Sequence, residues 1–563
     1  MLNSFKFSRK VLWSLVTMVL SFHIGDDHYG IHAQPIKFQN QEHQTFFDCY
    51  QTEEGECSDK ESETEFHQSG HLEDSVFFNK IQKIEVLGNS VLSDLALSEI
   101  TTSFIGKEAS IENLLEIRTQ ITRLYTEKGY TTSAAFIPSA QDISQGTVKV
   151  QVVEGKVEEI IVEGLNRLNK GYVLSRLPLE VPFNVAQWLE ALQILQADRL
   201  LEEVKAELGS GTAPGLNILT VKVKEADSFT VQLGSDNNRT PSVGSNRRGI
   251  FLSESNLFGN GEELSASYFN SEGSNSGYVG LTIPITQDGT LRVESGLTDN
   301  KIVERPFDVL DLNTESRYYQ VFLRQPVLKS PYDEVGLGLI FSRIESESYL
   351  DGFRFPLSRG ASERGETRIN AMRLVQDWTS NSNEQIIFLR SQLSFGLNLD
   401  GTSDFEPDSE FFHWNLQGQY LRQLAPDTLF ILRGELQQSD QELLPDEQFR
   451  AGGGATVRGY REDFILSDNG LWAMAEVQVP VLKITNWNAV VQIAPFISHG
   501  RGWNNDDFPL DPDSITSVGV GLRWVQPYFG ASLYWGIPLT TINEEKRTLQ
   551  ENGIYFNLRW NPF

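Results

Sequence analysis

From residue 227 to residue 563 the chain consists of short segments in which apolar and polar side chains alternate, separated by turn residues. A β-strand points successive side chains to opposite faces, so this alternation predicts strands with one apolar and one polar face. Sixteen such segments are predicted, at roughly 228–238, 247–257, 262–272, 276–285, 289–300, 315–327, 333–346, 365–378, 384–397, 411–424, 427–439, 469–482, 488–499, 514–525, 528–538 and 552–563. An even number allows an antiparallel sheet to close with both chain ends on one side.

The polar faces of these strands indicate a membrane barrel whose interior holds water or a loop. In the twelfth segment the predicted lipid-facing residues are Leu471, Ala473, Ala475, Val477, Val479 and Val481, with Trp472, Glu476 and Gln478 inside. A soluble sandwich also alternates, but there the apolar face is the interior. The connections after even-numbered strands are short and those after odd-numbered strands are longer on average, as in outer-membrane barrels.

Composition supports this class and excludes others. With 47 Lys and Arg against 76 Asp and Glu, the net charge of −29 argues against a nucleic-acid partner. After the N-terminus no stretch reaches the roughly 18 apolar residues of a transmembrane helix. The histidines are scattered, and no HExxH, GxSxG or P-loop motif occurs. We therefore expect no enzyme activity, no metal, no cofactor and no nucleotide.

An internal repeat precedes the barrel. The segment 80–92 (KIQKIEVLGNSVL) recurs as 156–168 (KVEEIIVEGLNRL), and each copy continues with two helical stretches and two strands. Ser110 and Asn184 are expected to cap the main helix of each copy. The order β-α-α-β-β predicts two small α+β domains, 77–154 and 155–226, each with an open sheet edge that could accept an extended polypeptide.

The N-terminus is predicted to be an export signal. Residues 1–33 place basic side chains before an apolar run and end at Ala33, which is the layout of a secretory signal peptide. Residues 34–76 are acidic and polar, and read as a linker that could also enter the barrel as a plug. In it, Cys49 and Cys57 could close a disulfide after export or stay as two thiols.

The sixth long connection contains the motif AGGGATVRGY, residues 451–460. Consecutive glycines allow the backbone to fold tightly in a confined space, where Arg458 is the one charged side chain of the motif. Local composition also fits a flexible surface loop. The strand count and the loop lengths favour a loop inside the barrel that plugs or gates it.

Together, the two repeats, the sixteen strands and VRGY in the sixth long loop resemble the two-partner secretion transporters (TpsB, haemolysin activator type) of the Omp85 superfamily, whose repeats are called POTRA domains. The resemblance covers about residue 77 to the end. It implies that Val457, Arg458, Gly459 and Tyr460 lie at the tip of a loop folded into the barrel. It also implies that the arginine contacts an acidic residue on the inner wall.

The expected acid is missing from its usual place. The family motif Phe-x-Asp-x-Gly corresponds here to Phe496, Ser498 and Gly500, with serine in place of aspartate. A buried arginine needs an anion or several acceptors. Strand alternation points to Glu476 first and Glu435 second as the partner of Arg458, although either glutamate could be a solvated charge lining the lumen.

The resemblance implies an outer-membrane pore of a Gram-negative-type cell with its POTRA domains in the periplasm. The pore would recognise an unfolded secreted partner, a TpsA-like exoprotein, and pass it to the surface. An insertase for outer-membrane proteins is the alternative. A diffusion porin is disfavoured, because a passive pore does not need periplasmic repeats.

Overall fold

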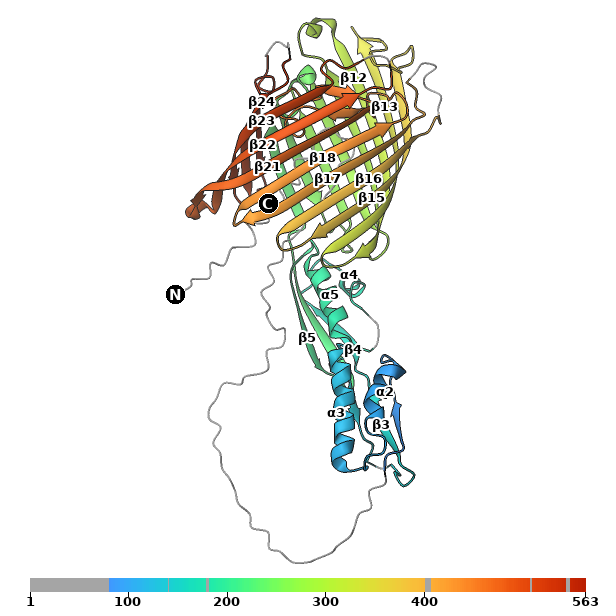
Figure 1. Cartoon of the computed structure of the whole chain (residues 1–563). Helices are drawn as coiled ribbons and strands as arrows, with labels where there is room; N and C mark the ends of the chain where they lie inside the picture. Colours follow the sequence, from blue (N-terminus) through green and yellow to red (C-terminus); the bar gives the residue numbers. More distant parts are fainter. Residues whose placement is uncertain are drawn as a thin grey trace, which may run out of the picture.

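The computed structural model describes residues 80–562, apart from residue 140 and the segments 179–181, 400–406, 507–508 and 543–546. The predicted signal peptide, the acidic segment 34–76, Cys49 and Cys57 lie outside the described residues. The described chain forms two small α+β units followed by a closed barrel, which confirms the predicted fold class (Figure 1).

The first unit is a three-stranded sheet with two helices. It contains β1 (Lys83–Leu87), α2 (Asp94–Thr102), α3 (Ile111–Glu127), β2 (Ala134–Phe136) and β3 (Thr147–Val153), with the sheet order β1-β3-β2. Ser110 caps α3, as predicted, by accepting the N–H of Asn113 at 3.3 Å. The apolar face of α3, at Ile117 and Ile121, packs with Val148 and Val150 of β3 in one buried core.

The second unit repeats this arrangement. It contains β4 (Lys156–Glu163), α4 (Lys170–Leu174), α5 (Val185–Gln196), β5 (Leu201–Ser210) and β6 (Leu216–Glu225), with the sheet order β4-β6-β5. Asn184 caps α5, again as predicted. Trp188 and Leu195 of α5 pack on Leu219 and Val221 of β6. Within the described part of the chain, no helix is long and apolar enough to span a membrane.

Sixteen strands close the barrel, and β14 (Phe353–Arg354) is only a two-residue extension paired with the end of β13. The strands are β7 (Phe229–Asp236), β8 (Arg247–Glu254), β9 (Glu263–Asn270), β10 (Ser274–Pro284), β11 (Thr290–Lys301), β12 (Leu312–Lys329), β13 (Asp333–Leu350), β15 (Glu366–Asn381), β16 (Gln385–Gly396), β17 (Phe412–Ala425), β18 (Thr428–Ser439), β21 (Asn469–Ile484), β22 (Ala489–Trp503), β23 (Ser514–Val525), β24 (Phe529–Pro538) and β25 (Ile554–Trp560). Antiparallel pairing of β25 with β7 completes the ring.

The two faces of the wall differ as the alternation predicts. On β21, Leu471 and Val481 are 37% and 52% exposed on the outside, whereas Trp472 and Glu476 are buried on the inside. The barrel interior near this strand is therefore filled with protein. The filling comes from the connection between β18 and β21, residues 440–468, which we call loop 6 and which carries the short hairpin β19 (Phe449–Ala451) and β20 (Ile465–Ser467).

The second α+β unit contacts the barrel at the turn between β8 and β9, and Figure 1 shows the two units extending away from that end. The N–H of Asn169 donates to the carbonyl of Gly259 at 2.8 Å. Arg199 forms an ion pair with Glu263 at the start of β9. Polar contacts in the turn and at the start of β9 therefore hold this unit against the wall.

Candidate functional site

The glycines of loop 6 take backbone conformations that other residues rarely adopt. Gly452, Gly453 and Gly459 have φ values of +123°, +93° and +107°. The hydroxyl of Thr456 accepts from the N–H of Gly452 and donates to its carbonyl, which ties the turn together. These residues allow the chain to turn back within the lumen and present Arg458 to the wall.

Arg458 forms a buried ion pair with Glu476 of β21. Its Nη1 donates to Oε2 of Glu476 at 2.5 Å, and both side chains are only 2% exposed. Its Nε donates to the carbonyl of Gly454 at 3.0 Å, within loop 6 itself. One guanidinium thus connects the loop to the wall and stabilises the turn that carries it.

The second oxygen of the Glu476 carboxylate also accepts hydrogen bonds. Oε1 of Glu476 accepts from Nε2 of Gln478 at 2.7 Å and from the hydroxyl of Tyr534 at 3.2 Å. The Arg458 guanidinium lies 3.8 Å from the centre of the Tyr534 ring and 4.8 Å from that of Phe496. Aromatic faces attract cations, so these rings add to the ion pair.

The other residues of the VRGY motif fasten the loop backbone. The N–H of Gly459 donates to the hydroxyl of Tyr555 at 2.8 Å, and that hydroxyl donates to the carbonyl of Tyr460. The hydroxyl of Tyr460 donates to the carbonyl of Thr516 at 2.6 Å. The tip of loop 6 is therefore held by strands β21 to β25.

Glycines on the wall make room for this tip. A Cβ at Gly500 would lie 3.0 Å from Cγ2 of Val457, and one at Gly536 would lie 2.7 Å from the nitrogen of Gly459. Both distances are shorter than ordinary contacts of a Cβ atom. The wall and the VRGY tip are thus matched in shape as well as in charge.

The structure does not bring Glu435 or Ser498 to Arg458. Glu435 accepts from Nδ2 of Asn415 at 2.6 Å and from the indole of Trp472 at 3.1 Å. Ser498 shares a 2.8 Å hydrogen bond with Ser517 on the neighbouring strand. Phe496 of the second motif does contact Arg458, through its ring.

Sequence reasoning did not identify Tyr534 and Tyr555, the wall tyrosines that contact the tip, or a further ion pair of loop 6. Arg461 pairs with Glu304, in the connection between β11 and β12, at 2.8 Å. Alternation along β25 places Tyr555 inside, but nothing in the pattern indicates that it meets loop 6. Among the described residues, no group of three His, Cys, Asp or Glu side chains could hold a metal ion.

Two family models match the chain. The model described as "POTRA domain, ShlB-type" matches residues 79–155. The model described as "Haemolysin secretion/activation protein ShlB/FhaC/HecB" matches residues 215–524, more than half of the chain.

Similar proteins include outer-membrane transporters. The chain is 22% identical over 468 residues to the outer membrane transporter CdiB of Dickeya dadantii, covering 79% of this chain and 81% of that protein. It is 23% identical over 461 residues to the heme/hemopexin transporter protein HuxB of Haemophilus influenzae, covering 79% and 80%.

Solved structures share the fold. CdiB from Escherichia coli matches with a TM-score of 0.66 at 18% identity, covering 88% of this chain and 92% of that one. BamA from Haemophilus ducreyi, lacking POTRA domains 1–3, matches with a TM-score of 0.53 at 15% identity, covering 86% and 100%.

Proposed function

The chain belongs to the haemolysin secretion/activation protein family ShlB/FhaC/HecB, and on that premise we propose that it captures an unfolded exoprotein in the periplasm and releases loop 6 to pass it outward. The family is one of two-partner secretion transporters, not of enzymes. The protein is an outer-membrane β-barrel with N-terminal POTRA domains that secretes a partner exoprotein.

The open sheet edges support capture by strand addition. In the second unit, β5 forms one edge over ten residues and pairs only with β6 among the described strands. An edge strand presents unpaired N–H and C=O groups to which an extended chain can add. An unfolded exoprotein with strand-forming segments fits this surface.

Loop 6 is the obstacle that the exoprotein has to displace. The Arg458–Glu476 pair is buried at both ends. Breaking such a pair by removing one partner costs about 3–5 kcal/mol, because an uncompensated charge stays buried. The pair can therefore keep the loop in place at rest. No nucleotide is needed, because folding of the emerging chain outside the cell would bias its movement.

Secretion by an Arg458→Ala variant tests this role, with pore conductance of the purified protein as a second readout. We expect altered secretion and a higher conductance, because the loop loses the buried attachment that keeps it in the lumen. Arg501→Ala is the matched control, since Arg501 is 59% exposed and pairs with Asp513 at the surface. Wild-type secretion together with wild-type conductance in Arg458→Ala would contradict the gating role.

The BamA-like fold leaves an insertase as the second candidate function. The two functions differ in what deletion removes. Loss of a dedicated transporter removes one or a few proteins from the culture medium, whereas loss of an insertase lowers many outer-membrane barrels at once. Quantitative proteomics of both fractions after deletion distinguishes them.

A further inference from the structure

Glu447 of loop 6 forms a second buried charge cluster with the barrel wall, separate from the VRGY tip. Its Oε1 accepts from Nη2 of Arg373 at 2.5 Å, and its Oε2 bonds to Nε2 of His413 at 3.0 Å. A carboxylate only accepts, so Nε2 of His413 carries the proton. The three side chains are no more than 4% exposed.

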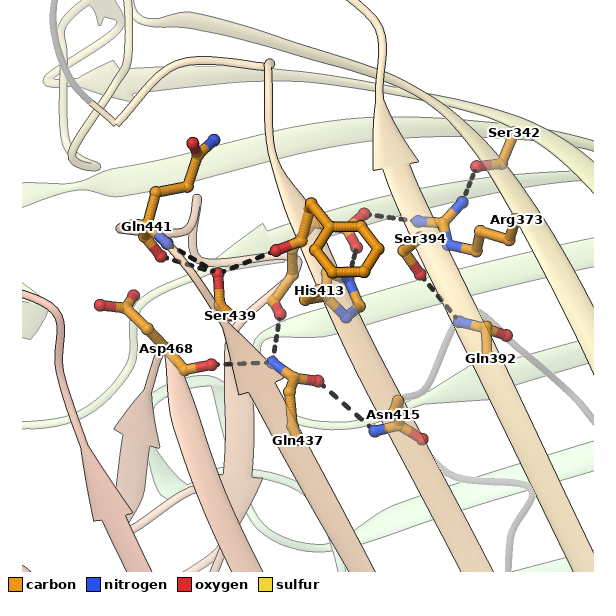
Figure 2. Close-up of polar contacts among 12 residues, drawn as sticks. Ser342, Arg373, Gln392, Ser394, His413, Asn415, Gln437, Ser439, Gln441 and Asp468 are labelled. Atoms are coloured by element: carbon orange, nitrogen blue, oxygen red, sulfur yellow. Dashed lines mark hydrogen bonds and ion pairs between the residues drawn. The ribbon is translucent and has the colours of Figure 1, made fainter.

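The two wall residues lie in one row across the sheet. Arg373 of β15 is paired in register with Ser394 of β16, and Ser394 is paired with His413 of β17. Arg373 also donates to the hydroxyl of Ser342 on β13, and Figure 2 shows these side chains on the same face of the wall. Arg373 is therefore bonded to the wall as well as to the loop.

Apolar contacts support the same part of loop 6. Leu443 and Leu444, which precede Glu447, are buried in a cluster of wall side chains: Tyr318, Ile344, Ile369, Ala371 and Phe411. The ring of Phe411 stacks on His413 with 5.6 Å between centroids. Burial of these two leucines favours the docked position of the loop. In that position the Glu447 carboxylate lies within hydrogen-bond distance of its partners.

The base of loop 6 is closed by the neighbouring strand. Nε2 of Gln437, on β18, donates to the carbonyl of Glu447 at 2.9 Å and to the carbonyl of Asp468 at 3.2 Å, and Figure 2 shows Gln437 beside Asp468. These bonds connect the first part of the loop and its last residue to one side chain. The Glu447 attachment is thus an integral part of the resting loop.

We propose that Glu447 is a second positioning residue for loop 6, which keeps the first part of the loop against β15 and β17 while Arg458 keeps the tip against β21. This inference rests on the proposed gating by loop 6. The two attachments have opposite polarity: the loop supplies the anion at Glu447 and the cation at Arg458. Because they contact different sectors of the wall, breaking the tip pair alone leaves the first part of the loop in the lumen.

The test measures how often loop 6 detaches from the inner wall of the barrel. Ala451, in β19, is 1% exposed, so a cysteine there is protected while the loop is docked. The probe is the full chain with Cys49→Ser, Cys57→Ser and Ala451→Cys, reconstituted in vesicles and treated with a membrane-impermeant maleimide. Glu447→Gln is compared with Glu442→Gln, a matched control in the same loop whose pair with Arg359 is partly exposed and contributes little.

We expect Glu447→Gln to raise the labelling rate roughly tenfold or more, because a buried arginine loses its charge partner. Glu442→Gln should label like the parent, and adding Arg458→Gln to Glu447→Gln should raise the rate further. Arg373→Gln provides the same test from the wall side if Glu447→Gln does not fold. Parent labelling rates in folded Glu447→Gln or Arg373→Gln would overturn the proposal. Labelling needs no exoprotein, so this result is independent of whether Arg458 controls secretion.

Discussion

Arg458 in loop 6 and Glu476 on β21 are joined by a 2.5 Å ion pair in which each side chain is 2% exposed. Glu476 is one of the inward residues of β21, two positions from Gln478, which donates to the same carboxylate. The charge that the serine at position 498 cannot provide thus comes from the adjacent strand. The contact between loop and wall that the family resemblance implies is made here with Glu476.

A double-mutant cycle between Arg458 and Glu476 should show strong coupling. Arg458→Gln and Glu476→Gln each leave one buried charge without its partner, so each should raise the open fraction of single channels roughly tenfold or more. The double variant should open no more than the worse single variant, because neither charge remains. Glu435→Gln, which lacks a contact with Arg458, is the control and should change the open fraction little. Independent, multiplying effects of the two changes would contradict the pairing.

Gly536→Ala should displace the VRGY tip without disrupting the strand pairing that closes the barrel sheet. The added Cβ would lie 2.7 Å from the nitrogen of Gly459, and such overpacking typically costs about 1–3 kcal/mol. Channel recordings should show more frequent opening. Gly234→Ala, where the nearest atom is 3.8 Å away, should behave like the wild type. Equal opening frequencies in the two variants would show that the VRGY tip does not depend on the absence of a side chain at position 536.

Replacing Arg433 by methionine should stabilise the barrel. Arg433, on β18, is 5% exposed, and its Nε and Nη1 lack hydrogen-bond partners among the described residues. Exchanging a poorly paired buried charge for an apolar side chain of similar length is expected to stabilise by about 1–4 kcal/mol. Thermal unfolding of the purified protein in detergent should shift upward. Arg523→Met should gain less, since Arg523 donates to Gln492 at 3.2 Å, and a lower midpoint for Arg433→Met would contradict this account.

Acid should loosen the turn at residues 166–168 of the second α+β unit, next to Asn169, which bonds to the barrel. Partial burial raises the pKa of Glu225, but the backbone N–H groups of Leu168, Asn166 and Arg167 outweigh it and hold the pKa below its ordinary value of 4.5. A lowered folded pKa gives stability that is present above the unfolded pKa and lost as pH falls through the folded pKa. Amide exchange at residues 166–168, corrected for the intrinsic pH effect, should therefore speed up below about pH 4.5. Glu225→Gln should show the faster exchange already at pH 7, and a pH-independent difference between the two proteins would contradict the role of the carboxylate.

Much of the fold was predictable because strand alternation and turn spacing are local. The sixteen barrel strands and the capped helices at Ser110 and Asn184 follow from periodicity and capping chemistry. Glu476 could be proposed as a partner of Arg458 for the same reason, since its position in an alternating strand sets its inward direction. These inferences require only the identities of the residues that neighbour each position in the sequence.

The contacts made by loop 6 could not be predicted in this way. Glu447 lies in a stretch without periodicity, and its partners Arg373 and His413 lie 74 and 34 positions earlier in the chain. Tyr555 reaches the tip from the last strand, 96 positions after Gly459. Such pairs depend on the register of the closed barrel and on the path of the loop through it, which no local pattern specifies.

The most direct test of the central claim is to lock loop 6 to the wall and measure secretion. A Cβ at Gly500 would lie 3.3 Å from Cβ of Ala451, close to the separation of about 3.5–4.5 Å in a disulfide. Ala451→Cys with Gly500→Cys, in a background of Cys49→Ser and Cys57→Ser, should therefore form a bridge under oxidising conditions, and each single cysteine serves as a control. We predict that the oxidised double variant stops secreting its exoprotein and recovers when the bridge is reduced. Undiminished secretion by fully bridged protein would contradict the claim that loop 6 has to leave the lumen.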